Sequence, residues 1–74
     1  VTPGAVLPAR ELLGDMLQLL GKPSEALVAY ETALSVSPGR ARSLRGAVQA
    51  AEKLGKINKA NEYKEYLRAM STTG

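Results

Sequence analysis

The chain has 74 residues, of which 45% are apolar and 23% are charged, and it contains no Cys and no His. This composition excludes a disordered tail, a disulfide-stapled scaffold and a metal site built on Cys or His ligands. It also removes the commonest catalytic base and the commonest thiolate nucleophile, so we expect no enzymatic activity and no cofactor. No apolar run approaches the roughly 20 residues of a membrane span, and we expect no membrane partner.

Apolar periodicity, together with the prolines and glycines that mark helix starts and ends, predicts four helices. Their expected ranges are about 8–20, 22–36, 39–54 and 57–70. Gly21 and Gly55 end the first and third helices, and the turn Ser37-Pro38-Gly39 follows the second. Connections this short place consecutive helices antiparallel. The sequence therefore predicts an all-α chain of two helical hairpins.

An internal repeat underlies these hairpins. A shift of 34 residues aligns Leu20-Gly21-Lys22 with Leu54-Gly55-Lys56, and Ala26 with Ala60. A period of this length indicates stacked helical units that bury their faces against one another. The pattern positions supplied by the first unit are Leu13, Gly14, Leu17, Ala26, Tyr30, Ala33 and Pro38. With these residues the unit resembles the tetratricopeptide repeat family.

The second unit departs from the family pattern, because Lys64 stands where an aromatic residue belongs. The run from residue 7 to residue 15 is also similar to the C-terminal repeats of larger bacterial repeat proteins of unknown function. The resemblance implies two stacked hairpins in a short right-handed α-solenoid. Repeat 1 would span residues 7–39 and degenerate repeat 2 residues 40–71. Residues 1–6 would be a linker from an upstream region, and residues 72–74 a disordered tail.

The resemblance further implies a non-enzymatic scaffold that binds a peptide or a partner helix in a groove lined by the first helix of each repeat. The expected groove residues are Glu11, Asp15, Gln18, Arg42, Arg45, Gln49 and Glu52. Arg42 and Arg45 lie one turn apart and suit a carboxylate ligand. The alternative is that Glu11 and Asp15, expected on an exposed face, pair with these two arginines. Both interpretations stay open at this stage. We also expect Gly14 to face Ala26 where the helices cross.

The ends of the chain suggest a second kind of assembly. Six large apolar residues fall between residues 12 and 20, so this first helix is expected to cover an upstream helix or to form a homodimer. The fourth helix has a polar outer face, which is typical of a terminal cap. The alternative function is therefore homo-oligomerisation through the end faces. The composition suits a soluble protein of the cytoplasm or the periplasm and does not separate the two.

Charge makes nucleic acid a third partner class. Residues 1–38 carry two bases and four acids, a net charge of −2, whereas residues 39–74 carry eight bases and three acids, a net charge of +5. The bases wind around two helices instead of forming one stripe. Only Tyr63 and Tyr66 stand among them for base stacking. A basic nucleic-acid module is therefore the least favoured of the binding functions.

Overall fold

The structure is a computed structural model that describes residues 9–71. Over this range it contains four α-helices and no β-strand. The helices are α1 (Ala9–Leu19), α2 (Pro23–Val36), α3 (Ala41–Lys53) and α4 (Ile57–Ser71). The predicted all-α class is confirmed, and the helix ends within the described range lie within two residues of the expected ones. The expected linker at residues 1–6 and tail at residues 72–74 lie outside the described residues.

The turns that close α1 and α3 have the same geometry. Gly21 has a φ of 76° and Gly55 a φ of 78°, a left-handed conformation that costs glycine least. In both turns the N–H of the next lysine donates to the carbonyl five residues earlier, at 2.9 Å for Lys22 and 2.8 Å for Lys56. This is the hydrogen bond of a Schellman motif, and it satisfies a helix-end carbonyl. The repeated sequence thus specifies a repeated turn.

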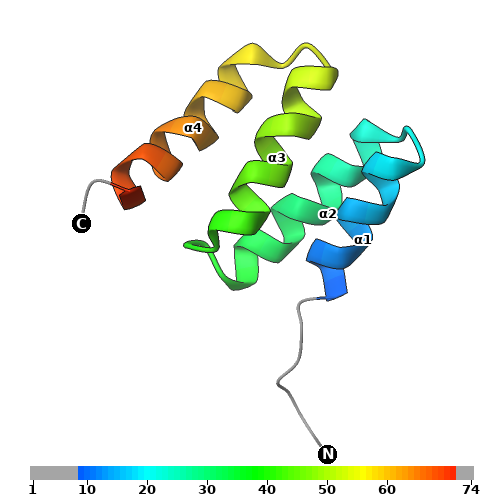
Figure 1. Ribbon diagram of the computed structural model, residues 1–74, viewed down its shortest axis with the longest axis horizontal. Helices are drawn as coiled ribbons and strands as arrows, with labels where there is room; N and C mark the ends of the chain where they lie inside the picture. The colour runs from blue at the N-terminus through cyan, green and yellow to red at the C-terminus, as the bar shows by residue number, and fades with distance from the viewer. Residues whose placement is uncertain (1–8, 72–74) are drawn as a thin grey trace, which may run out of the picture.

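The helices follow one another in chain order across Figure 1, and each packs on the next. In addition, α1 contacts α3 directly. The core between the helices is rich in alanine, and its buried members are Ala26, Leu27, Tyr30, Ala47, Val48, Ala50, Ala51 and Ala60. Small side chains at such contacts let helix axes approach closely. The direct contact between α1 and α3 places these two helices side by side.

The ring of Tyr30 fills the space between α2, α1 and α3, and this residue is only 1% exposed. A Cβ atom added at Gly14 would lie 2.7 Å from Tyr30 Cε1, and one added at Gly46 would lie closer still to the ring. Both positions therefore need glycine because the Tyr30 ring lies against the backbone. The expectation that Gly14 faces Ala26 stays a prediction, and the three atoms that would come nearest to an added Cβ at Gly14 belong to Tyr30.

The two outer helices differ in what they expose. Five large apolar residues of α1 and the turn after it are exposed: Leu12, Leu13, Met16, Leu19 and Leu20. In α4 only Ala60 is fully buried among the residues with described side chains, in keeping with the expected polar outer face. Within residues 9–71, no helix has the length and apolarity needed to cross a membrane.

Candidate functional site

The polar residues expected to bind a partner lie along one face of α1 and one face of α3. Their spacings of three and four residues keep each set on a single side of its helix. A hollow of about 360 Å³ lies between the two faces and is lined by Asp15, Gln18, Leu19, Tyr30, Arg42, Gln49 and Lys53. We call this face, together with Glu11, Arg45 and Glu52 of the same two helices, the α1/α3 surface. The structure thus brings four of the seven expected residues to one hollow.

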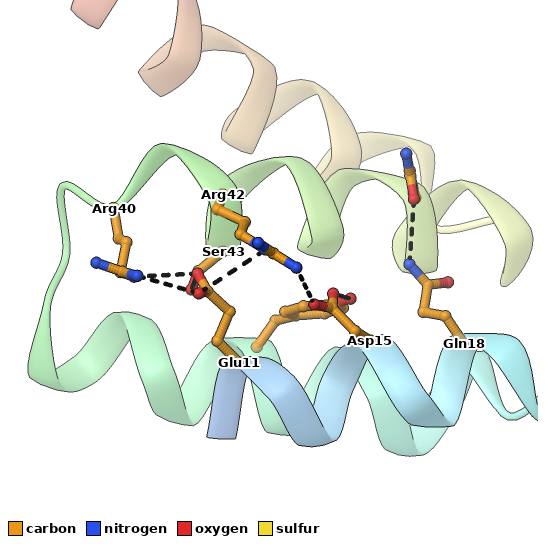
Figure 2. Close-up of polar contacts among 8 residues, drawn as sticks. Glu11, Asp15, Gln18, Arg40, Arg42 and Ser43 are labelled. Atoms are coloured by element: carbon orange, nitrogen blue, oxygen red, sulfur yellow. Dashed lines mark hydrogen bonds and ion pairs between the residues drawn. The ribbon is translucent and has the colours of Figure 1, made fainter. Parts of the chain in front are cut away.

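Glu11 lies at one end of this surface and is buried, with 2% of its area exposed. Figure 2 shows Arg40, Arg42 and Ser43 converging on its carboxylate from the α3 side. Arg40 donates from Nε to Oε2 at 3.1 Å and from Nη2 to Oε1 at 3.2 Å, and Ser43 Oγ donates to Oε2 at 2.7 Å. The expectation of an exposed Glu11 is therefore wrong, because Arg40 and Ser43 supply the hydrogen bonds that a buried carboxylate requires.

Two opposing effects act on the Glu11 carboxyl. Burial raises its pKa, but the hydrogen bonds from Arg40 and Ser43 and the positive charges of Arg40 and Arg42 outweigh burial and hold the pKa below its ordinary value of 4.5. Glu11 is consequently a carboxylate at neutral pH. Its role in the structure is to join α1 to the start of α3.

Asp15, one turn further along α1, has a different pair of donors. Arg42 Nη2 donates to Asp15 Oδ2 at 2.8 Å, and the Tyr30 hydroxyl donates to Asp15 Oδ1 at 2.5 Å. Burial, together with the hydrogen bond to Asp15, raises the pKa of Tyr30 to about 12. Arg42 Nε also lies 4.0 Å from Glu11 Oε1. Arg42 is thus held by the protein's own acids.

The two acids of α1 pair with arginines at α3, as one interpretation of the sequence expected, and Arg42 is one of the expected partners, but Arg40 takes the place of Arg45. They take Arg40 and Arg42, whereas Arg45 is exposed and forms no ion pair within the described residues. Sequence reasoning left Arg40 out of the groove because its position does not share the three- and four-residue spacing of the groove residues of the third helix. In the structure Arg40 precedes α3 as its N-cap residue. Sequence reasoning missed Ser43 because a lone serine in a helix carries no signal of its own.

Two carboxamides connect α1 and α3 in the middle of the surface. Gln18 Nε2 donates to Gln49 Oε1 at 3.3 Å and to the Gly46 carbonyl at 3.4 Å. Gln18 Oε1 is buried and accepts no hydrogen bond within the described part of the chain. Gln49 itself is exposed, so its amide faces the hollow with capacity for a further partner.

The far end of the surface is formed by the last turns of α3. Glu52 Oε2 lies 2.7 Å from Lys64 Nζ of α4, so this acid has a partner within its own hairpin. Lys53 lines the hollow, is exposed and makes no ion pair among residues 9–71. Sequence reasoning left out Lys53 from the candidate site, although it lies only one turn from Gln49.

A second polar cluster joins α2 to α4, away from this surface. Lys59 Nζ and the Tyr63 hydroxyl both donate to Glu31 Oε2, at 2.8 and 2.7 Å. Burial raises the pKa of Glu31, but these two hydrogen bonds and the Lys59 charge lower it to a greater extent, and the net pKa is below 4.5. The cluster joins α2 to α4 through side-chain hydrogen bonds.

No group of three or more acidic side chains in the range 9–71 is arranged to hold a metal ion. Comparisons of the chain with protein-family models, with curated proteins and with solved structures find no match. The geometry of the chain itself is therefore the basis for a functional proposal.

Proposed function

We propose that this chain is a non-enzymatic protein–protein interaction scaffold of the tetratricopeptide type. In this proposal the α1–α2 and α3–α4 hairpins are two repeats of a short right-handed solenoid, and the α1/α3 surface binds a peptide or a partner helix. The proposal is supported by the shared Gly21 and Gly55 turns and by the resemblance of the first repeat to the family pattern.

The observation that carries the proposal is the polar hollow on the α1/α3 surface. It combines an exposed carboxamide, Gln49, an exposed apolar side chain, Leu19, and an unpaired cation, Lys53. Concave sites with a few convergent polar groups are where proteins commonly bind ligands. Hydrogen-bonding amides suit a peptide because every peptide unit offers a donor and an acceptor.

This proposal can be tested by panning a phage-displayed peptide library on the immobilised chain. Selected peptides are then titrated by fluorescence polarisation against the parent chain and two variants. Gln49→Ala removes the groove amide and should weaken the selected peptides by about fivefold, the value of roughly one hydrogen bond. Asn61→Ala removes another exposed amide, on α4, and should leave affinity unchanged. Selected peptides that respond to neither variant would contradict a role for the α1/α3 surface.

A specific observation favours a second function, self-association through α1. Leu12, Leu13, Met16, Leu19 and Leu20 have exposed fractions between 41% and 87%, and they are half of the ten large apolar residues exposed in the described chain. A hollow of about 300 Å³ with an apolar floor lies beside them, between α1 and α2. Contiguous apolar surface of this kind marks interaction sites.

Light scattering coupled to chromatography over a concentration series tests self-association. A dimer built on this face should grow with concentration and persist in high salt, because the contact is apolar. Met16→Glu should shift the population to monomer. Ile57→Glu is the matched control, since Ile57 on α4 is 55% exposed and Met16 is 59% exposed. A parent chain that is monomeric at every concentration excludes the dimer.

A further inference from the structure

The hollow between α1 and α2 is a groove with an apolar floor and two charged residues at its edges. It encloses about 300 Å³, and its lining includes the apolar residues Leu13, Leu17, Val28 and Ala29 and the charged residues Arg10 and Glu25. Leu13 is 41% exposed and Val28 is 62% exposed, so the floor is open at the molecular surface. We call this feature the α1/α2 groove.

The two charged residues lie at opposite ends of the groove. Arg10 belongs to the first turn of α1 and also lines a smaller hollow with Ala33 and Val36, so it lies beside the end of α2. Glu25 belongs to the first turn of α2, next to the turn that joins the two helices. Ala33 is eight residues beyond Glu25 on α2. At a rise of 1.5 Å per residue, the two charges therefore lie about 12 Å apart along the groove.

Neither of these charges is neutralised within residues 9–71. Both side chains are exposed, and neither Arg10 nor Glu25 takes part in any of the ion pairs of this range. An apolar centre with a polar rim is the arrangement found in protein–protein interfaces. The α1/α2 groove thus has the composition of an interface that offers one unmatched charge of each sign.

The apolar floor continues onto the outer face of α1. Leu13, Met16 and Leu20 follow one another at spacings of three and four residues, which places them on one side of the helix. Their exposed fractions are 41%, 59% and 66%. The apolar area therefore extends beyond the groove and suits a partner that presents a helical face of its own.

A second copy of the chain can neutralise both charges. In a two-fold symmetric contact, each residue meets the residue whose position the axis exchanges with its own. An axis that crosses midway between Arg10 and Glu25 lays each Arg10 over Glu25 of the second copy. We propose that the α1/α2 groove is the interface of a two-fold symmetric dimer, with two such pairs at its rim and the apolar floors packed against each other. This inference rests on the proposed self-association through α1 and specifies its surface, its symmetry and its pairing.

The same charges disfavour other ways of packing two copies. A dimer whose two grooves run in the same direction sets Arg10 against Arg10 and Glu25 against Glu25, and like charges repel. A head-to-tail contact occupies the groove of one copy and leaves that of the other free, so it grows into larger oligomers. The charge arrangement therefore favours a closed dimer.

The test exchanges the two charges. Arg10→Glu sets acid against acid at both ends of the interface, and Glu25→Arg sets base against base. Each variant alone should dimerise about tenfold more weakly than the parent chain at low salt, about threefold for each of the two pairs. An equimolar mixture of the two variants should form a heterodimer with the affinity of the parent dimer, because every acid then faces a base. Sedimentation equilibrium measures the affinities, and native mass spectrometry identifies the heterodimer by its mass.

Two further variants control for net charge. Lys56→Glu and Glu62→Lys change the net charge by the same amounts, on exposed residues outside the groove, and should leave the dimer affinity within about twofold of the parent value. Equal weakening by these controls would show a general charge effect and overturn the proposal. Circular dichroism records the helical content of every variant, and rescue in the mixture requires that both charge-reversed chains are folded.

The outcomes separate this inference from the self-association on which it rests. If the parent chain dimerises and Met16→Glu gives monomer, but either charge reversal leaves the dimer unchanged, the pairing fails and self-association stands. Weakening by both reversals without a heterodimer in the mixture also overturns the two-fold pairing, as do oligomers larger than a dimer. A parent chain that is monomeric at every concentration overturns both proposals and leaves the groove to a different partner.

Discussion

Glu11 and Ser43 are joined by a 2.7 Å hydrogen bond although 32 residues separate them in the chain. Both residues are buried, Glu11 at 2% and Ser43 at 0% exposure. One belongs to α1 and the other to α3, so the bond joins these two helices. The position of α3 relative to α1, and with it the shape of the α1/α3 surface, depends in part on this buried polar contact.

The first prediction concerns the stability that this contact provides. Glu11→Ala should lower the free energy of unfolding by about 2 kcal/mol, because the buried Ser43 hydroxyl loses its acceptor. The loss is smaller than for a fully buried ion pair, since the Arg40 side chain is 41% exposed and can turn to water. Urea denaturation at a fixed protein concentration measures the effect. Glu25→Ala, on an exposed residue of α2, should change stability by less than about 0.5 kcal/mol.

A double-mutant cycle adds a sharper comparison. Ser43→Ala alone should cost about 1 kcal/mol, the typical value of one hydrogen bond. The Glu11→Ala, Ser43→Ala double variant should be less destabilised than the sum of the two single variants, because each change removes the same bond. Strict additivity would show that the two side chains do not interact in solution.

The second prediction is a loss of stability in acid. The pKa values of Glu11 and Glu31 are both lower in the folded chain than the ordinary value of 4.5, so the unfolded chain binds protons first as the pH falls. Their contribution is complete above pH 4.5 and is lost as the pH falls below it through the folded-state pKa values. Glu11→Gln should therefore flatten the dependence of unfolding free energy on pH below 4.5. A Glu11→Gln curve parallel to that of the parent chain would contradict the lowered pKa.

Much of the fold could be predicted from local sequence. Gly21 and Gly55 marked the ends of α1 and α3, and the left-handed φ values at both positions explain why glycine stands there. Apolar periodicity placed the helices, because helix positions depend on residues three and four apart. The arrangement of the hairpins as a solenoid stays a prediction drawn from the family resemblance.

The contacts between hairpins could not be predicted in the same way. Helical spacing puts a glutamate outside the apolar stripe and so on the surface, but Glu11 is buried because Arg40 and Ser43 of a distant helix enclose it. Which arginine meets which acid depends on the register of α1 against α3, and no local pattern reports that register. The acids of α1 do pair with arginines at α3, as the pairing interpretation of the sequence held. Arg45, which it also chose as a partner, is not one of them.

The third prediction concerns Tyr30 at high pH. Its pKa is raised from 10.0 to about 12, so the neutral phenol is favoured in the folded chain. The stability that it contributes is complete below pH 10 and is lost as the pH rises towards 12. Tyr30→Phe should remove this part of the alkaline loss and should cost about 1 kcal/mol at neutral pH, because the hydrogen bond to Asp15 is absent. Urea denaturation at several pH values measures both effects.

A matched control for this variant is Tyr66→Phe. Tyr66 is 56% exposed, and its hydroxyl forms no hydrogen bond within residues 9–71. At neutral pH this variant should change the free energy of unfolding by less than about 0.5 kcal/mol. Equal costs for Tyr30→Phe and Tyr66→Phe would contradict a structural role for the Tyr30 hydroxyl.

The last prediction tests the packing of Tyr30 against two glycines. Replacing glycine by alanine inside a helix stabilises the helix by about 1 kcal/mol when nothing else changes. At Gly46, however, an added methyl group would overlap the Tyr30 ring, and at Gly14 it would lie 2.7 Å from Cε1. Overpacking of this kind costs about 1–3 kcal/mol. We expect Gly46→Ala to be destabilising by about 2 kcal/mol and Gly14→Ala by about 1 kcal/mol.

Gly39 provides the opposite expectation and so separates packing from backbone effects. A Cβ atom at Gly39 would meet no atom within 4 Å, and its φ is not positive. Gly39→Ala should therefore be neutral or stabilising by up to about 1 kcal/mol, by restricting the unfolded chain. If the Tyr30 ring is the cause of the cost at Gly46, a smaller side chain should relieve it. Tyr30→Leu combined with Gly46→Ala should be less destabilised than the sum of the two single changes by about 1 kcal/mol, and additive costs would rule out the contact.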